Sequence, residues 1–273
     1  MGGSTATIAS RLANERAEGV RSSGARLLAS DDHLVGAQVP RTMASGVEDN
    51  HEYDAPEGIV AWVSAIAPDG TAFAVDRIGS SVPFDAAEEA AVAMAVDHRR
   101  DEFHTGRRLA REALAQLGCP ATSLPPDGDR VPRWPTDFVG TISHSRELCV
   151  ALVGRASQYV GIGIDIEKIA RIEPGLEPLI CRTDELELER TGWTVDQTSL
   201  RFVAKEAFFK AYFPATRTFL EFLDVRVVLD PASARFEALL MEPGSPSLYG
   251  SRAFAGHFAT LGGHIAAAVW IPR

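Results

Sequence analysis

The pattern of apolar and polar residues divides the chain after residue 50 into short runs separated by turn-forming residues. Two early runs, 58–63 and 72–78, are rich in β-branched and aromatic residues, which favour strands. The sequence Pro68-Asp69-Gly70 between them is typical of a tight turn. The pattern therefore predicts a β-hairpin at the start of the ordered part of the chain.

The next region carries the signals of two helices. Asp85 and, three residues later, Glu88 resemble a capping box and predict a helix that continues to residue 96. A second helical pattern covers 101–117 and is followed by Gly118 and Pro120, which commonly end helices. We therefore predict two helices before the loop at 120–135, which is rich in Pro, Asp and Gly.

The remainder of the chain mixes strands and helices. We predict strands at 149–153, 159–166, 225–229, 253–258 and 264–271, and helices around 184–189 and 200–212. Because these elements do not follow a regular βαβ alternation, the predicted fold class is α+β. Residues 1–50 show no sustained period among their Ala, Ser, Gly, Arg and Asp residues, so we expect a flexible extension there.

Composition limits the classes of function. With 45% hydrophobic and 23% charged residues, the 273-residue chain has the composition of a soluble globular protein. Its net charge of -10 argues against general nucleic-acid binding, so a polyanionic ligand would have to meet a local basic patch. The three cysteines are widely spaced, and no apolar run reaches the length of a membrane span. These features and the lack of a secretory signal predict a cytoplasmic protein.

A pair of carboxylates stands in one of the predicted strands, within Gly163-Ile164-Asp165-Ile166-Glu167. Alternate side chains of a strand point to one face, so Asp165 and Glu167 should project together while the isoleucines face a core. At roughly 4 Å, two carboxylates repel by about 4 kcal/mol at an effective dielectric of about 20. A magnesium ion, which prefers oxygen ligands and phosphates, would offset this repulsion. The alternative is an ordinary strand with a solvated acidic face.

Positive charge is concentrated between residues 98 and 111 of this acidic chain. At helical spacing, Arg100, His104, Arg107 and Arg111 form one stripe. Guanidinium groups bind phosphate oxygens in bidentate fashion, so the stripe indicates a phosphate site. The alternative is a solvated helix face whose charges pair with the acidic residues at 97, 101 and 102.

The sequence Thr141-Ile142-Ser143-His144-Ser145 would place a histidine and two hydroxyl groups at a strand end. A serine hydrolase is not favoured, because adjacent residues of a strand point to opposite faces and the GxSxG motif is absent from the sequence. A histidine that contacts phosphate explains the segment better. A purely structural histidine is the alternative.

Taken in order, five segments resemble the Sfp-type 4'-phosphopantetheinyl transferases, in particular the enterobactin synthase component D branch. The segments are Arg99-Arg100-Asp101-Glu102-Phe103 with Arg107 and Arg111, Pro132-Arg133-Trp134-Pro135, Thr141-Ile142-Ser143-His144-Ser145, Gly163-Ile164-Asp165-Ile166-Glu167 and Lys205-Glu206-Ala207-Phe208-Phe209-Lys210. The resemblance covers about residues 58–271. It implies two similar α+β halves with pseudo-twofold symmetry, 51–157 and 158–273, with coenzyme A and Mg²⁺ in the cleft between them.

The resemblance also implies an activity. The enzyme would transfer 4'-phosphopantetheine from coenzyme A to a serine of an acyl, peptidyl or aryl carrier protein, releasing adenosine 3',5'-bisphosphate. Siderophore, nonribosomal peptide or polyketide biosynthesis would use the product, and the two-half architecture would function as a monomer. Two other classes remain open: a metal-dependent phosphohydrolase, and a non-catalytic protein that binds coenzyme A or a carrier.

The residues that would carry out the chemistry follow from the matching motifs. Asp165 and Glu167 match the metal carboxylates of the family, and Glu206 matches a third acidic residue that ligates the metal, acts as a base, or does both. Lys210 matches a lysine that reaches the diphosphate, and His144 matches a histidine that contacts phosphate.

Further positions match the coenzyme-binding residues of the family. Arg99 and Arg107 match basic residues that hold the nucleotide phosphates, and Ser143 belongs to the phosphate-contacting turn. Leu220 falls where this branch lines the cleft. Arg130 is the nearest candidate for a basic residue that the family often has before Pro-x-Trp-Pro, although it is displaced by about one position.

Overall fold

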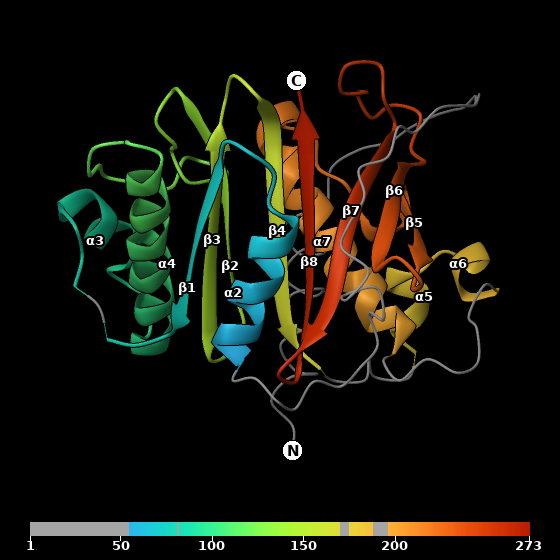
Figure 1. The fold of residues 1–273 in the computed structure, drawn as a ribbon, viewed down its shortest axis with the longest axis horizontal. Coiled ribbons are helices and arrows are strands. Elements are labelled where there is room, and N and C mark those ends of the chain that lie inside the picture. The colour runs from blue at the N-terminus through green and yellow to red at the C-terminus, as the bar shows by residue number, and fades with distance from the viewer. Residues whose placement is uncertain (1–54, 81, 170–174, 188–195) are drawn as a thin grey trace.

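Two antiparallel sheets and the helices packed against them make up the computed structural model (Figure 1). It describes residues 55–80, 82–169, 175–187 and 196–273, so the extension predicted for 1–50 lies outside the described residues. The elements are α2 (Ala55–Ile66), β1 (Thr71–Arg77), α3 (Ala86–Val92), α4 (Asp97–Gln116), β2 (Phe138–His144), β3 (Leu148–Arg155), β4 (Tyr159–Lys168), α5 (Glu177–Ile180), α6 (Thr183–Glu187), α7 (Gln197–Thr216), the 3-10 helix η2 (Phe222–Asp224), β5 (Val225–Asp230), β6 (Arg235–Leu240), β7 (Ala253–Leu261) and β8 (His264–Pro272).

The first sheet has the strand order β1-β3-β2, and the second has the order β4-β8-β7-β6-β5. Every pairing between neighbouring strands is antiparallel. The predicted α+β class is therefore confirmed. The chain passes from the first sheet to the second through residues 156–158, next to the boundary predicted at Ser157. A functional division into halves at that point stays a prediction.

The hairpin predicted for residues 58–78 is wrong, because its first run is the helix α2. Ile59, Trp62 and Val63 are buried, whereas Val60 is exposed, which is a helical rather than an alternating pattern. The β-branched composition suggested a strand, and the spacing of three and four residues outweighed it. The turn at Pro68-Asp69-Gly70 does exist, but it joins α2 to β1, and β1 pairs with β3.

Strand β3 is buried on both of its faces. Leu148, Val150 and Leu152 pack in the cluster beneath α2, while the intervening Cys149 and Ala151 pack beneath α4. A strand covered on both sides reads as a continuous apolar run, and this is what made it visible in the sequence. Helix α4 is thereby fixed on one face of the first sheet.

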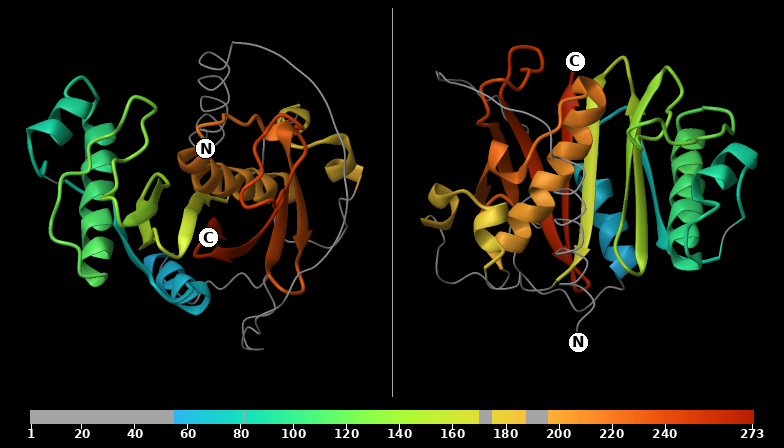
Figure 2. Two further views of the ribbon diagram at one scale, coloured as in Figure 1. Left: turned by 90° about the horizontal axis from the view of Figure 1, so that it is seen from above. Right: turned by 180° about the vertical axis from the view of Figure 1, so that it is seen from behind.

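The two sheets meet where β2 lies beside β4. Thr141 and Ser143, alternate residues of β2, accept hydrogen bonds from the backbone amides of Ile164 and Ile166 of β4, at 3.4 and 3.3 Å. Side-chain hydroxyls therefore take the place of a backbone ladder at the junction. Helix α2 covers one side of this junction and α7 lies on the other, as the view from above in Figure 2 shows.

The predicted starts and ends of helices are mostly close to those observed. The Asp85 carboxylate caps α3 by accepting the amides of Ala87 and Glu88 at 3.0 and 2.9 Å. Helix α3 ends at Val92, and α4 begins at Asp97, four residues before the predicted start. No helix among the described residues is long and apolar enough to cross a membrane.

Candidate functional site

The carboxylate of Asp165 lies at the junction of the two sheets and is fully buried. Its Oδ1 atom accepts hydrogen bonds from Lys210 Nζ at 2.6 Å and from Ser143 Oγ at 2.7 Å. Lys210 Nζ also donates to Ser143 Oγ at 3.0 Å. Strands β4 and β2 and helix α7 thus each contribute one side chain, and residues 22 to 67 positions apart in the chain are brought together.

Two glycines of β4 allow α7 to come close enough for this contact. Gly161 and Gly163 lie on the same strand face as Asp165, and a Cβ atom on either would overlap the carbonyl oxygen of Ala211 or Ala207. The backbone of α7 therefore rests directly on the backbone of β4. The sequence Gly161-Ile162-Gly163, which does not fit a phosphate loop, has this packing role.

We expect Gly163→Ala to destabilise the protein by about 1–3 kcal/mol, a range typical of overpacking. The added methyl group must push α7 away from β4, because the atoms that it meets belong to the Ala207 backbone. Lys210 then moves away from Asp165. Urea unfolding measures the loss of stability. Gly79→Ala is the matched control, because a Cβ atom there meets nothing within 4 Å. Equal stability of the two variants would contradict the packing role.

The other two predicted carboxylates lie on the elements that bear Asp165 and Lys210. Glu167 is buried on β4, two residues from Asp165, and Glu206 is partly buried on α7, one turn before Lys210. In the described part of the chain, no three His, Cys, Asp or Glu side chains are grouped closely enough to hold a metal ion. The metal role of all three carboxylates therefore stays a prediction.

One oxygen of Asp165 fits that prediction. The Oδ2 atom is buried and has no hydrogen-bond partner among the described residues. A buried carboxylate oxygen without a partner carries a desolvation cost, which a bound cation would offset. Mg²⁺ is usually held by one or two carboxylates together with substrate phosphates, so it does not require a cluster of three.

A second polar cluster surrounds Glu102 near the start of α4. Glu102 Oε2 lies 2.8 Å from Arg99 Nη1, and Glu102 Oε1 lies 3.4 Å from His144 Nδ1. Arg99 Nη1 is also 2.8 Å from His144 Nε2. The structure thus brings two of the predicted phosphate-binding side chains together, at the end of the strand that also carries Ser143.

The predicted stripe along α4 is divided between two roles. Arg100 pairs with Glu89 and Arg111 pairs with Glu88, each at 2.5 Å. Both arginines therefore form ion pairs with helix α3. The sequence alternative was pairing with neighbours on the same helix, and the partners on α3 were missed. Glu88 also accepts the amide of Leu124 at 2.9 Å and so fixes the following loop.

Arg107 is buried and donates to a backbone carbonyl group rather than to a glutamate of α3. Its Nε donates to the carbonyl oxygen of Leu124 at 2.6 Å, and its guanidinium group lies 4.3 Å from the ring centre of Phe103. The pKa of Arg107 is lowered to about 10, chiefly by burial; the nearby cations Arg99 and Arg111 also lower it, whereas Glu88 raises it. The side chain remains positively charged at neutral pH.

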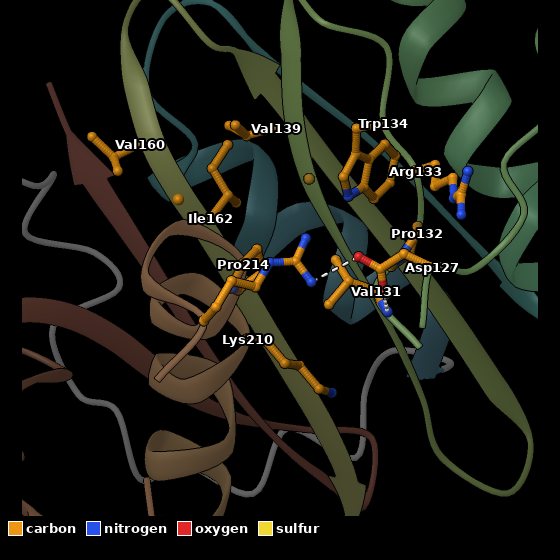
Figure 3. A pocket seen from close by; sticks show the side chains of 13 residues that line it. Asp127, Val131, Pro132, Arg133, Trp134, Val139, Val160, Ile162, Lys210 and Pro214 are labelled. Carbon is orange, nitrogen blue, oxygen red and sulfur yellow. Dashed lines mark hydrogen bonds and ion pairs between the residues drawn. The ribbon is translucent and has the colours of Figure 1, made fainter. Parts of the chain in front are cut away.

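A cleft of about 350 Å³ lies between the loop before β2 and helix α7. In Figure 3, Trp134 lies on one side of the cleft, Ile162 of β4 lies near Val139 on the other side, and Lys210 stands at one end. Arg217 at the end of α7 reaches across to the loop and pairs with Asp127 at 2.7 Å. The cleft is therefore bounded by both sheets and leads to the lysine that contacts Asp165.

Two predicted coenzyme-binding residues lie elsewhere. Arg130 is at the exposed tip of the loop with a left-handed φ of 67°, and its neighbour Arg133 lines the cleft instead. Leu220 is 6% exposed and packs in the core of the second sheet rather than in the cleft wall. A role for either residue in coenzyme binding stays a prediction.

The two lysines of the 205–210 segment have different partners. Lys205 is buried and donates to Glu185 Oε2 at 2.7 Å and to the carbonyl oxygens of Ile180 and Phe222 at 2.8 and 3.0 Å. All three ammonium hydrogens thus have acceptors. Burial lowers the pKa of Lys205, although the adjacent Glu185 opposes the shift. Lys205 holds α5, α6 and η2 on α7, whereas Lys210 reaches the site.

Comparison with known proteins identifies the family. Residues 87–154 match the 4'-phosphopantetheinyl transferase N-terminal domain, and residues 161–267 match the 4'-phosphopantetheinyl transferase superfamily. The 4'-phosphopantetheinyl transferase Svp of Streptomyces mobaraensis is 36% identical over 67% of this chain and 76% of its own length. The 4'-phosphopantetheinyl transferase Npt of Nocardia iowensis is 31% identical over 67% of this chain and 87% of its own length. Enterobactin synthase component D of Escherichia coli is 33% identical over 48% of this chain and 62% of its own length. As its motifs predicted, the chain belongs to the 4'-phosphopantetheinyl transferase superfamily and is a phosphopantetheinyl transferase.

Proposed function

We propose that this transferase moves 4'-phosphopantetheine from coenzyme A to a serine of an acyl, peptidyl or aryl carrier protein in a magnesium-dependent reaction. The serine oxygen forms a bond to the phosphorus that carries the pantetheine arm. The bond from that phosphorus to the bridging diphosphate oxygen breaks, and adenosine 3',5'-bisphosphate leaves. The observation that carries this assignment is the contact of buried Asp165 with Lys210 at the end of a cleft bounded by both sheets.

The basic residues are proposed to bind the phosphates of coenzyme A. Arg99 and His144 lie side by side, and Lys210 stands one strand position further along β2, at Ser143. This arrangement would spread positive charge along the diphosphate and the second phosphate of the nucleotide. Phosphoryl transfer depends mainly on positioning and charge stabilisation, so such a row of donors suits the reaction.

Asp165 and Glu167 are proposed to hold Mg²⁺. The supporting observation is that Asp165 Oδ2 has no hydrogen-bond partner in the described part of the chain. When bound, Mg²⁺ would neutralise charge on the diphosphate and favour departure of the bisphosphate. Lys210 holds the Asp165 carboxylate in place from the cleft side. Glu206, one helical turn from Lys210, is proposed to accept the proton of the carrier serine.

The assignment is tested by incubating the protein with coenzyme A, Mg²⁺ and an apo carrier protein, and weighing the carrier by mass spectrometry. We expect the mass of one phosphopantetheine to be added, and none to be added to a carrier whose acceptor serine is alanine. Bisphosphate release with an unmodified carrier would instead indicate a phosphohydrolase. Coenzyme binding with neither product would indicate a non-catalytic binding protein.

We expect Arg107→Ala to raise the Kd for coenzyme A by about 10–100-fold, as loss of a charged hydrogen bond worth about 1.5–3 kcal/mol predicts. Carrier recognition should be retained. Calorimetry measures both affinities. Arg108→Ala is the matched control, because Arg108 pairs with Asp76 and Glu112 at the surface of the same helix. Unchanged coenzyme affinity in Arg107→Ala would show that Arg107 has a structural role, through its contacts with Leu124 and Phe103, and does not bind the coenzyme.

A further inference from the structure

Glu102 is a nearly buried carboxylate to which three basic side chains converge. Its side chain is 10% exposed. His98 Nε2 and His144 Nδ1 lie 2.9 and 3.4 Å from Oε1, and Arg99 Nη1 lies 2.8 Å from Oε2. Both carboxylate oxygens therefore face basic side chains. By contrast, Glu88 of α3 also accepts a backbone amide and ties a loop to two helices.

The contacts determine which nitrogen of neutral His144 carries the proton. Arg99 Nη1 lies 2.8 Å from His144 Nε2, and a guanidinium group can donate but not accept a hydrogen bond. His144 Nε2 must therefore be the acceptor, so the single ring proton resides on Nδ1. This nitrogen faces the carboxylate of Glu102. The tautomer is thus set from both sides of the ring.

We propose that Glu102 is a positioning residue that orients Arg99 and His144 as one phosphate-binding unit. The inference rests on the proposed function, in which these two side chains bind the phosphates of coenzyme A. Glu102 holds the guanidinium group through Oε2 and the imidazole ring through Oε1. When a phosphate oxygen replaces Arg99 at His144 Nε2, that nitrogen takes up a proton from solvent and donates it to the phosphate oxygen, and Glu102 is the counter-ion of the resulting imidazolium at Nδ1.

Two variants separate the charge of Glu102 from its shape. Glu102→Gln keeps the length and one acceptor, whereas Glu102→Leu removes both acceptors. Loss of an outer-shell partner that orients a metal ligand typically costs about 10–100-fold, and we expect a rise of similar size in the Kd for coenzyme A in Glu102→Leu. A smaller rise is expected in Glu102→Gln. Calorimetry with coenzyme A alone measures both.

The tautomer provides a readout that a merely structural role would not change. The ¹⁵N chemical shifts of the His144 ring, measured well above the ordinary histidine pKa of about 6.5, report which nitrogen is protonated. We expect Nδ1–H in the wild type and a shift toward Nε2–H in Glu102→Leu. Glu89→Gln is the matched control for Glu102→Gln, because it removes the charge of the α3 carboxylate that pairs with Arg100 of α4 and should change neither readout.

The outcomes distinguish this inference from the proposed function. If the wild type loads the carrier but Glu102→Leu keeps wild-type affinity and tautomer, the Glu102 role is overturned and the transferase assignment stands. The same holds if Glu89→Gln weakens binding equally. If Glu102→Leu does not fold, Glu102→Gln decides by the same two measurements. Failure of the wild type to load any carrier counts against the proposed function, while affinity and ring shifts still test Glu102.

Discussion

Asp165→Asn and Asp165→Ala should both abolish carrier loading while the protein stays folded. The carboxylate joins β4, β2 and α7 through Ser143 and Lys210, and its second oxygen is buried without a hydrogen-bond partner among the described residues. If that oxygen holds the ion, its loss should remove several kcal/mol of charge stabilisation from the transition state. About 4 kcal/mol corresponds to roughly a 10³-fold loss of rate. Intact-carrier mass spectrometry over time measures the loss.

The fold should survive because each neighbour of Asp165 keeps an alternative partner. The Lys210 side chain is 22% exposed and can be hydrated, and Ser143 Oγ still accepts the amide of Ile166. Asp137→Asn, an exposed carboxylate just before β2, is the control for a general charge effect. Binding of Mn²⁺, followed by electron paramagnetic resonance, provides a readout independent of activity. Wild-type turnover of Asp165→Asn at saturating magnesium would refute the metal role.

The position of Asp165 could be predicted from the sequence because it depends on one strand. Alternation in β4 sends Ile164 and Ile166 into the core beneath α2 and leaves the odd positions facing α7. The spacing of Glu206 and Lys210 likewise required only helical geometry. Local patterns could not show which segments meet, because the bonds of Ser143 and Lys210 to Asp165 cross 22 and 45 positions, and only the family resemblance indicated a shared site.

Two errors in the secondary structure predicted from the sequence have the same physical origin. Residues 58–63 have the composition of a strand, yet their apolar residues recur at helical spacing and cover the junction of both sheets. Strand β6 was not predicted, although Phe236, Ala238 and Leu240 are buried in alternation. In each case the burial period carried the information, and composition alone was the weaker signal.

Charge partners were the least predictable feature. Arg100 and Arg111 looked available for phosphate, but α3 places Glu89 and Glu88 against them. Glu102, which the alternative interpretation of the basic stripe placed on a solvated face, is nearly buried and contacts Arg99 and His144. The partners of Glu88 and Glu89 are fixed by the packing of α3 against α4, which no local pattern predicts. Glu102 has the local partners His98 and Arg99 on its own helix, and only its contact with His144 depends on the packing of β2 against α4.

Replacing the two lysines of α7 should separate stability from activity. Lys205→Met leaves Glu185, which is fully buried, without its cation, and breaking a buried pair typically costs about 3–5 kcal/mol. Lys210→Met should cost distinctly less, because water can reach the partly exposed end of that pair. Its rate of carrier loading should nevertheless fall by roughly 10²–10³-fold, as loss of one charge-stabilising donor predicts. Urea unfolding and the loading rate, measured on both variants, test the contrast.

A double variant decides whether Lys205 acts through its ion pair. An apolar replacement of both members of a buried pair is often neutral or stabilising, so Lys205→Met with Glu185→Leu should recover part of the stability lost in Lys205→Met. Recovery is incomplete because Glu185 also accepts the amides of Val227 and Arg182 at 2.6 and 2.7 Å. If Lys205→Met unfolds at the wild-type urea concentration, or if it loses loading while fully stable, Lys205 belongs to the chemistry rather than to the framework that holds α7 over Asp165.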